Sequence, residues 1–446
     1  MTPQSLVARD APSRPPTPGS RRRPGLVRTA LGLLPFQVAL RGGEALLPLF
    51  LAAWFGRSAE TDLYYLFATY FVFASALLTG AFQDSAVIPV LIEVEAADPA
   101  SVPGIAGSLL GHTLAIGAAV GLGTGAIASG VVALTTHMHA VAYELVAVMA
   151  AGVVVIGVRA FYVGLLNARG AFHAYPVASG LGTALTFATV YVGRGFGVRV
   201  IPLATLAGEL LAIVLLAYLA RRVLGARVTP SLARPAPVRR IFALVRLEVT
   251  GTIITRVNPF VDQLMAGLAA VVGGGTLLRY AGDVAALPTS ILQAVLFPVL
   301  LTRLAGEAAD PAAFAATTRR TLIVVVVLLA ALSGVMIALR APICEVLFLH
   351  GAMDRGGVAR IAGVLPWALV GAPAFGALLV LSRAHVALQN SRIMPGMGIL
   401  NSLLNIVLNA VLVGVMGLGG LSLATSLTYV VVAVVFWFRL PRAARA

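Results

Sequence analysis

Long apolar stretches without a single charged residue are the feature that most constrains this chain. Examples are residues 114–134, 145–158, 210–219, 321–339 and 402–416. Helical stretches of roughly 20 apolar residues match the hydrocarbon thickness of a bilayer. The whole chain is 59% hydrophobic and 11% charged, whereas a soluble domain averages about 25% charged residues. We therefore predict an all-α polytopic membrane protein, and the composition excludes a water-soluble globule.

The apolar pattern predicts about twelve transmembrane helices. They lie near residues 30–55, 62–91, 104–134, 142–166, 176–194, 200–221, 240–268, 277–302, 319–340, 360–388, 395–417 and 419–438. An even number of spans returns the chain to its starting side of the membrane, so both ends are expected on one side.

Arginine supplies the basic residues of this chain, which carries a net charge of +15. The arginines flank the apolar stretches and concentrate before the first span, in residues 221–240, in residues 303–320 and after the last span. Positive charge marks the cytoplasmic side of membrane proteins. Both termini are therefore predicted to be cytoplasmic, and the basic charge is interpreted as a topology signal, with no nucleic acid as partner.

The charge pattern also predicts the division of the chain. Residues 1–28 form a disordered basic cytoplasmic tail, and residues 29–222 form an N-terminal lobe of six helices. A basic cytoplasmic linker at 223–239 leads to a second six-helix lobe at 240–440, followed by a short tail at 441–446.

Two sequence motifs each occur twice, in the same order in both halves of the chain. Residues 86–100 read AVIPVLIEVEAADPA, and residues 294–313 read AVLFPVLLTRLAGEAADPAA. A second echo, Asn-x-Arg before a proline, occurs in 164–176 and again in 386–395. Repeats at so long a period indicate a duplicated domain. We expect two parallel lobes related by a pseudo-twofold axis along the membrane normal, with a substrate cavity between them.

Ionisable residues at membrane depth are costly and usually face a cavity or a partner. In the first span Arg41 and Glu44 share one helical face, and both an internal ion pair and a cavity role stay open. In the seventh span Arg256, Asn258 and Asp262 surround Pro259, which favours a kink. For this group we favour a cavity role.

The candidate substrate site is completed by Asp62, Arg159, Arg279 and Asp283. Asp62 opens the second span, where a helix cap is the favoured interpretation. Arg159 lies deep in the fourth span, and Glu209 in the sixth is a similar candidate. Arg279 and Asp283 are spaced i, i+4 in the eighth span, as expected of a pair on one helical face.

Motifs for catalysis or nucleotide binding are not found, so no enzyme activity, cofactor or metal site is predicted. Cys344 is the single cysteine, which excludes an intramolecular disulfide. Transport would then depend on an ion gradient, the membrane potential or a substrate gradient. A coupling cation is therefore a candidate partner.

At several motifs the sequence resembles the MurJ/MviN family of lipid-linked peptidoglycan precursor flippases, within the multidrug/oligosaccharidyl-lipid/polysaccharide exporter superfamily. The segments are FGRSAETDLYYLF, GAFQDSAVIPVL, GLLNARGAFHAYP, the stretch from Asp262 through Tyr280 to Pro288, LFLHGAMD, SRAHVALQNSRIMP and GLSLATSL. The resemblance covers nearly all of residues 35–440. It implies a bacterial inner-membrane protein with a twelve-span core, two lobes and an alternating-access cavity for a lipid-linked oligosaccharide.

The chain departs from the family pattern at three arginine positions. The family's span-1 Arg-Asp pair falls near Leu47 and Pro48, its arginine before Gly-Ala-Phe is missing, and Gly282 and Asp283 replace its Asp-Arg. The family arginines serve the anionic head group of lipid II. The resemblance implies that Arg41, Arg256 and Arg279 take this role from neighbouring turns.

The lead hypothesis is a flippase for lipid II or a related undecaprenyl-pyrophosphate saccharide, with membrane lipids as surroundings. One alternative is a cation-coupled exporter of small organic cations, which would use the carboxylates of Glu44, Glu248 and Asp262. Another is a membrane scaffold without transport activity, for which an apolar and closed interface between the lobes is expected.

Overall fold

The computed structural model describes residues 43, 46–80, 87–135, 139–268, 271–388, 390 and 392–441. In α8 the side chains of residues 244–257 are not part of that description. The described chain is helical throughout and contains no β-strand, which confirms the all-α fold class.

A short apolar helix at Leu46–Phe55 precedes the labelled elements. The first lobe continues with α2 (Ala59–Gly80), α3 (Val87–Ala97), α4 (Val102–Thr135), α5 (His139–Ala168), α6 (Ala174–Gly193) and α7 (Val200–Leu224). The chain then enters α8 (Ala236–Leu268), α9 (Gly274–Glu307), α10 (Pro311–Ala338), α11 (Arg340–Phe348), α12 (Arg355–Leu369), α13 (Ala372–Ala387), α14 (Ile393–Met416) and α15 (Leu418–Arg439).

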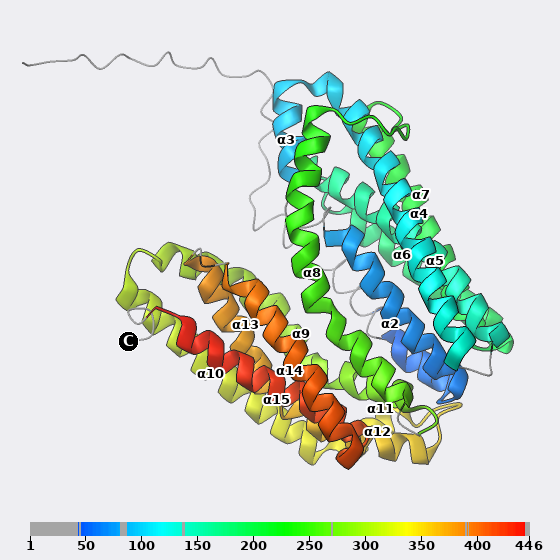
Figure 1. The fold of residues 1–446 in the computed structure, drawn as a ribbon, viewed down its shortest axis with the longest axis vertical. Coiled ribbons are helices and arrows are strands. Elements are labelled where there is room, and N and C mark those ends of the chain that lie inside the picture. The colour runs from blue at the N-terminus through cyan, green and yellow to red at the C-terminus, as the bar shows by residue number, and fades with distance from the viewer. Residues whose placement is uncertain are drawn as a thin grey trace, which may run out of the picture.

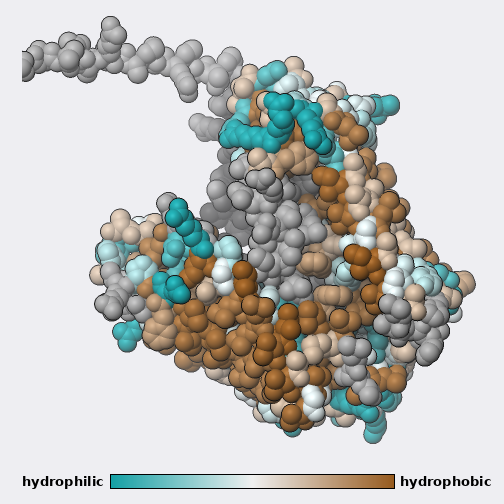
Figure 2. All heavy atoms as spheres, viewed as in Figure 1, coloured by the Kyte–Doolittle hydropathy of each residue, from teal (hydrophilic) through white to brown (hydrophobic). Residues whose placement is uncertain are grey.

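By length and apolarity alone, six described helical stretches are able to cross a membrane, and the bent pair α12–α13 is a seventh. One of the six joins α6 and α7 across a short 3-10 turn at Arg194–Arg199. Large apolar side chains lie exposed on the outside, among them Leu122, Val214, Val327 and Val411. Figure 2 shows this apolar surface extending over both lobes, as expected of a protein surrounded by lipid. The full count of twelve spans stays a prediction.

The repeated Ala-Ala-Asp-Pro phrase marks a helix start in each half. Asp310 caps α10 by accepting hydrogen bonds from Ala312 and Ala313 amides, and Pro311 occupies the first turn. Asp98 caps a 3-10 turn that leads into α4 by accepting a hydrogen bond from the Ala100 amide, and Pro99 occupies the first position of that turn. Aspartate accepts from the free amides at a helix start, and proline has no amide to leave unpaired there.

Two lobes diverge from one shared end to form a V, as Figure 1 shows. We call residues 46–224 lobe 1 and residues 258–440 lobe 2. The start of α8 packs in the core of lobe 1 through Val238 and Ile241, while Ala266 near its end packs in the core of lobe 2. Helix α8 therefore connects the lobes along its length. The boundary of the second lobe at residue 240 stays a prediction.

The end at which the lobes meet is called the closed end here. It contains the 56–58 loop of lobe 1 and the 271–273 and 349–354 loops of lobe 2. Tyr65 of lobe 1 packs edge-on against Tyr280 of lobe 2, with ring centroids 5.6 Å apart. The 225–235 linker lies at the other end, where Ser231 donates to the Gly107 carbonyl at the start of α4.

Candidate functional site

A cavity of about 440 Å³ lies among α8, α9, α12, α13 and α15 of lobe 2 and reaches Thr69 on α2 of lobe 1. We call it the central cavity. Hydroxyl, amide and charged side chains contribute to its wall: Thr69, Asp262, Gln263, Arg279, Asp283, Thr289, Ser290, Gln293, Ser422, Thr425, Ser426 and Tyr429. The structure thus brings three of the predicted residues, Asp262, Arg279 and Asp283, to one cavity.

Arg279 and Asp283 form the ion pair that their spacing on α9 predicts. The Arg279 Nε lies 3.0 Å from Asp283 Oδ1 and donates to Oδ2 at 3.1 Å. Both side chains are partly exposed to the cavity. Since these contacts use Nε, the two terminal nitrogens of Arg279 remain able to bind an anionic group. A guanidinium presents such nitrogens as a planar fork that matches phosphate oxygens.

Asp262 lies at the centre of a polar cluster built by three helices. The Asn409 amide donates to Asp262 Oδ1 at 2.5 Å, and the Thr425 hydroxyl donates to Oδ2 at 3.2 Å. Asn405 connects the two by donating to Thr425 at 3.0 Å and accepting from Asn409 at 3.1 Å. Asn405 and Asn409 are fully buried. The cluster therefore surrounds one carboxylate with neutral polar groups.

Sequence reasoning missed Asn405, Asn409 and Thr425. A signal was present, because two asparagines spaced i, i+4 interrupt the apolar stretch 402–416. Polar side chains at that spacing share one helical face. Their partner on α8, however, is Asp262, which lies 147 residues before Asn409 and 163 before Thr425, and only the packing of α8, α14 and α15 brings them together.

A second cavity of about 350 Å³ borders the same cluster from inside lobe 2. Its wall is mostly apolar and includes Phe375, Met394 and Met397. Asn258 lines it beside Asp262, and its amide reaches the Asn401 carbonyl at 3.5 Å. Asp262 therefore faces both cavities.

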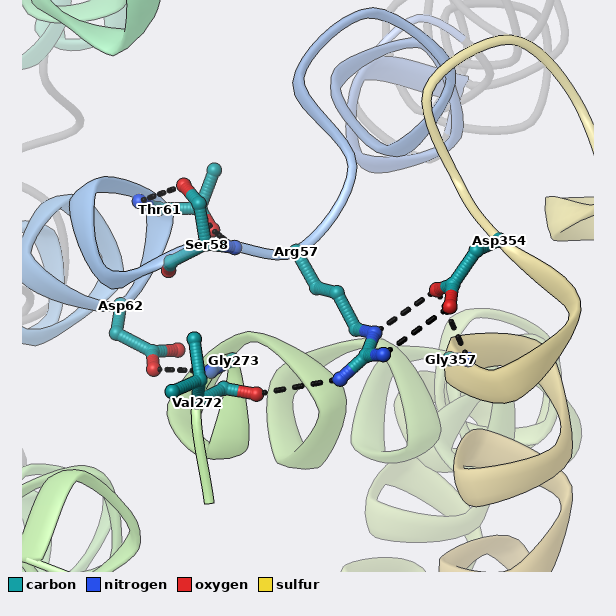
Figure 3. Close-up of polar contacts among 8 residues, drawn as sticks. All are labelled: Arg57, Ser58, Thr61, Asp62, Val272, Gly273, Asp354 and Gly357. Carbon is teal, nitrogen blue, oxygen red and sulfur yellow. Dashed lines mark hydrogen bonds and ion pairs between the residues drawn. The ribbon is translucent and has the colours of Figure 1, made fainter. Parts of the chain in front are cut away.

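Asp62 caps a helix, but not the helix that it opens. Its carboxylate accepts from the amides of Gly273 and Thr276, each at 2.8 Å, and from the Thr276 hydroxyl at 2.8 Å. It therefore caps α9 of lobe 2 from lobe 1, as Figure 3 shows for the Gly273 contact. The start of α2 is instead closed by Ser58 and Thr61, whose hydroxyls accept from each other's amides.

Arg159 lies inside lobe 1, where its Nε is 2.6 Å from Glu209 Oε2. Its guanidinium also stands over the Tyr175 ring, 5.5 Å from the centroid. The two charged side chains are 15% and 24% exposed. Neither lines the two cavities described above. This arrangement is that of an ion pair within one lobe.

Three predicted residues fall outside what the structure describes. Arg41 and Glu44 belong to undescribed positions, and of Arg256 only the helical backbone of α8 is described. Their roles in substrate binding stay predictions.

Comparison with known proteins gives one family and one fold. The profile of the family described as Lipid II flippase MurJ matches residues 51–446. No curated protein matches the sequence. Among solved structures, a lipid II flippase MurJ in an inward closed conformation is similar with a TM-score of 0.72 at 18% identity, over 91% of this chain and 87% of that one.

Two transporters of the MOP superfamily are also similar. An inward-facing multidrug resistance MATE transporter has a TM-score of 0.69 at 12% identity, over 90% of this chain and 93% of that one. A MOP superfamily transporter from Pyrococcus furiosus, described by a reversed polarity of its binding pocket, has a TM-score of 0.61 at 16% identity, over 92% and 93%. At these identities the likeness to solved structures shows the fold alone.

Proposed function

The chain belongs to the MurJ family of lipid II flippases, and from this premise we propose that it carries lipid II, or a related undecaprenyl-pyrophosphate saccharide, through its central cavity by alternating access. The family consists of multi-pass proteins of the inner membrane that act as transporters and not as enzymes. The alternative of a small-molecule exporter is not favoured by this membership.

The observation that carries the proposal is the central cavity with Arg279 in its wall. An anionic pyrophosphate would bind the terminal nitrogens of Arg279, which donate to no side chain among the described residues, because charge-assisted hydrogen bonds are strong. The hydroxyl and amide groups of the wall offer partners for sugar hydroxyls. The apolar tail would remain in the bilayer. A cavity wall that includes the charged side chains of Arg279 and Asp283 also counts against the scaffold without transport activity, for which an apolar and closed interface is expected.

We assign the closed end to the periplasmic side and the end with the 223–239 linker to the cytoplasm. The support is the arginine content of that linker, because positive charge marks the cytoplasmic side. In this orientation both termini are cytoplasmic, and the lobes diverge toward the cytoplasm, where the lipid-linked precursor would enter.

The Asp262 cluster is the proposed site of a coupling cation. Hard monovalent cations prefer oxygen ligands, and Asp262, Asn405 and Thr425 offer oxygens within one cluster. The side-chain oxygen of Asn409 is buried and has no hydrogen-bond partner among the described residues. Rotating this amide by half a turn would replace its nitrogen by that oxygen beside Asp262, which a bound cation would favour. The donor set therefore fits a cation such as Na⁺.

The decisive experiment is translocation of labelled lipid II by the purified protein in proteoliposomes, paired with rescue of cells depleted of their own flippase. We expect translocation and rescue by the wild-type chain. Translocation of another undecaprenyl-pyrophosphate saccharide, with lipid II left behind, would replace the substrate but keep the mechanism. A chain that moves neither would refute the proposed function.

A further inference from the structure

Arg57 connects one lobe to two separate loops of the other. It lies between the 46–55 helix and α2, at the closed end. Its Nε donates to Asp354 Oδ1 at 2.8 Å and its Nη2 donates to Oδ2 at 3.1 Å, so the pair is bidentate. Its Nη1 reaches the Val272 carbonyl at 3.4 Å. Figure 3 shows the side chain extended between these partners.

The backbones around this pair pack closely. The Ala352 amide of lobe 2 donates to the Ala53 carbonyl of lobe 1 at 2.7 Å. Gly56 and Gly351 both have φ of +60°, and a Cβ added to Gly56 would stand 2.5 Å from the Ala352 carbonyl oxygen. Glycine is required where a positive φ and such a close approach coincide. The loops of the two lobes therefore form a continuous seam beside the Arg57 pair.

Asp354 has a second role in its own lobe, which guides the choice of variants. Its Oδ1 accepts from the Gly357 amide at 3.0 Å and so caps α12. Asparagine is as good a cap as aspartate, so Asp354→Asn removes the negative charge and preserves the cap. The Arg57 hydrogen bond lowers the pKa of Asp354 to about 2, so the carboxylate is ionised at physiological pH.

We propose that Arg57 is a positioning residue of the transport cycle, a latch that holds the 272 and 354 loops of lobe 2 against lobe 1 while the cavity faces the other end. The inference rests on the alternating access proposed above, in which the closed end must open for the cargo to leave. Asp62 binds the start of α9 from the same side, so opening separates both contacts. Asp354 is 55% exposed, and an exposed ion pair contributes only about 0–1 kcal/mol. A latch of that strength biases an equilibrium without blocking it.

The test measures the distance between the lobes at the closed end. Spin labels are placed at Phe196→Cys of lobe 1 and Val346→Cys of lobe 2, which are 80% and 71% exposed and do not contact Arg57. The one native cysteine, Cys344, is buried and is replaced by alanine. Double electron–electron resonance then reports the population with separated loops, without any substrate.

We expect Arg57→Gln and Asp354→Asn each to raise the separated population by about two- to fivefold, the range that a contribution below ~1 kcal/mol allows. The double variant should change no more than Arg57→Gln alone, because Asp354→Asn removes only an interaction that Arg57→Gln already removes. High salt should raise the separated population of the wild type, because it screens the ion pair, and should leave the separated population of the double variant unchanged. The matched control is Arg303→Gln, which breaks the Arg303–Glu307 pair inside α9 and should leave the distance unchanged.

Unchanged distances in both single variants, or additive changes in the double variant, would overturn the latch. This outcome is distinguishable from failure of the proposed function, because the distance measurement needs no cargo. A wild-type chain that does not translocate lipid II but responds to Arg57→Gln would retain the latch and lose the substrate assignment. A wild-type chain that translocates lipid II, but whose label distance is not changed by Arg57→Gln, would retain the substrate assignment and lose the latch.

Discussion

In lobe 1, Arg159 meets Glu209 at 2.6 Å and the two charges neutralise each other between helices. In lobe 2, Asp262 is surrounded by neutral asparagine and threonine groups and faces two cavities. Both lobes place ionisable side chains among packed helices, where an uncompensated charge is costly. Among the described residues, lobe 1 thus holds the Arg159 charge in a closed pair, whereas lobe 2 keeps the Asp262 carboxylate at the wall of two cavities.

The largest expected effect comes from breaking the pair in lobe 1. Glu209→Gln should leave the partly buried Arg159 guanidinium without the Glu209 carboxylate and lower the free energy of unfolding by up to ~3–5 kcal/mol. Thermal unfolding of the purified protein in detergent measures this, with Glu60→Gln at the start of α2 as a control on the same lobe. A Glu209→Gln protein that is as stable as the wild type yet inactive in transport would instead make Arg159 a substrate residue.

The second effect concerns the accessible charge of lobe 2. Arg279→Gln should weaken binding of the lipid-linked pyrophosphate by about 10- to 100-fold, because a hydrogen bond to a charged group contributes about 1.5–3 kcal/mol. Unfolding should hardly change, since the Arg279–Asp283 pair is partly exposed. Binding of labelled lipid II to the purified protein tests this, and Arg303→Gln at the far end of the same helix is the control. Equal binding by both variants would remove Arg279 from the site.

A third effect tests whether the Asp262 cluster binds a cation. Adding a carboxylate with Asn409→Asp should tighten Na⁺ binding by about tenfold, because cation affinity rises with the number of charged ligands. Asp262→Asn should abolish the Na⁺ dependence of translocation. The readout is protection from thermal unfolding by NaCl compared with choline chloride. Identical protection of the wild type and Asp262→Asn would place any coupling cation elsewhere.

The smallest expected effect is that of pH on the closed end. The pKa of Asp354 is lowered to about 2 by its hydrogen bond from Arg57. A lowered pKa stabilises the pair above the ordinary value of about 3.9, and this stabilisation is lost only as the pH falls toward 2. The distance between labels at positions 196 and 346 should therefore stay constant from pH 5 to pH 8. A transition within that range would show that another group controls the closed end.

Interactions within one helix or one turn were predictable from the sequence. The spacing of Arg279 and Asp283 predicted their pairing, because α-helix geometry brings residues four apart to one face. Apolar patterning predicted the helices themselves, and Asp262 was recognised as a cavity residue from its charge and the nearby proline.

Interactions between helices were predictable only in part. Asp62 was recognised as a cap, but its partner is α9, which begins more than 200 residues later. The residues around Asp62 do not show whether its carboxylate caps its own helix or a different helix. Arg159 was expected in a cavity for its charge, and its pairing with Glu209 depends on the packing of α5 against α7.

By itself the sequence determined that this is a helical membrane protein, that Arg279 pairs with Asp283 on one helical face and that Asp62 caps a helix start. These properties follow from apolar length, helix periodicity and capping chemistry, which act over a few neighbouring residues. Only the tertiary structure decided that Arg57 meets Asp354 across 297 positions and that Asn409 meets Asp262 across 147. Such contacts arise from how two lobes pack and separate, and no local pattern encodes that arrangement.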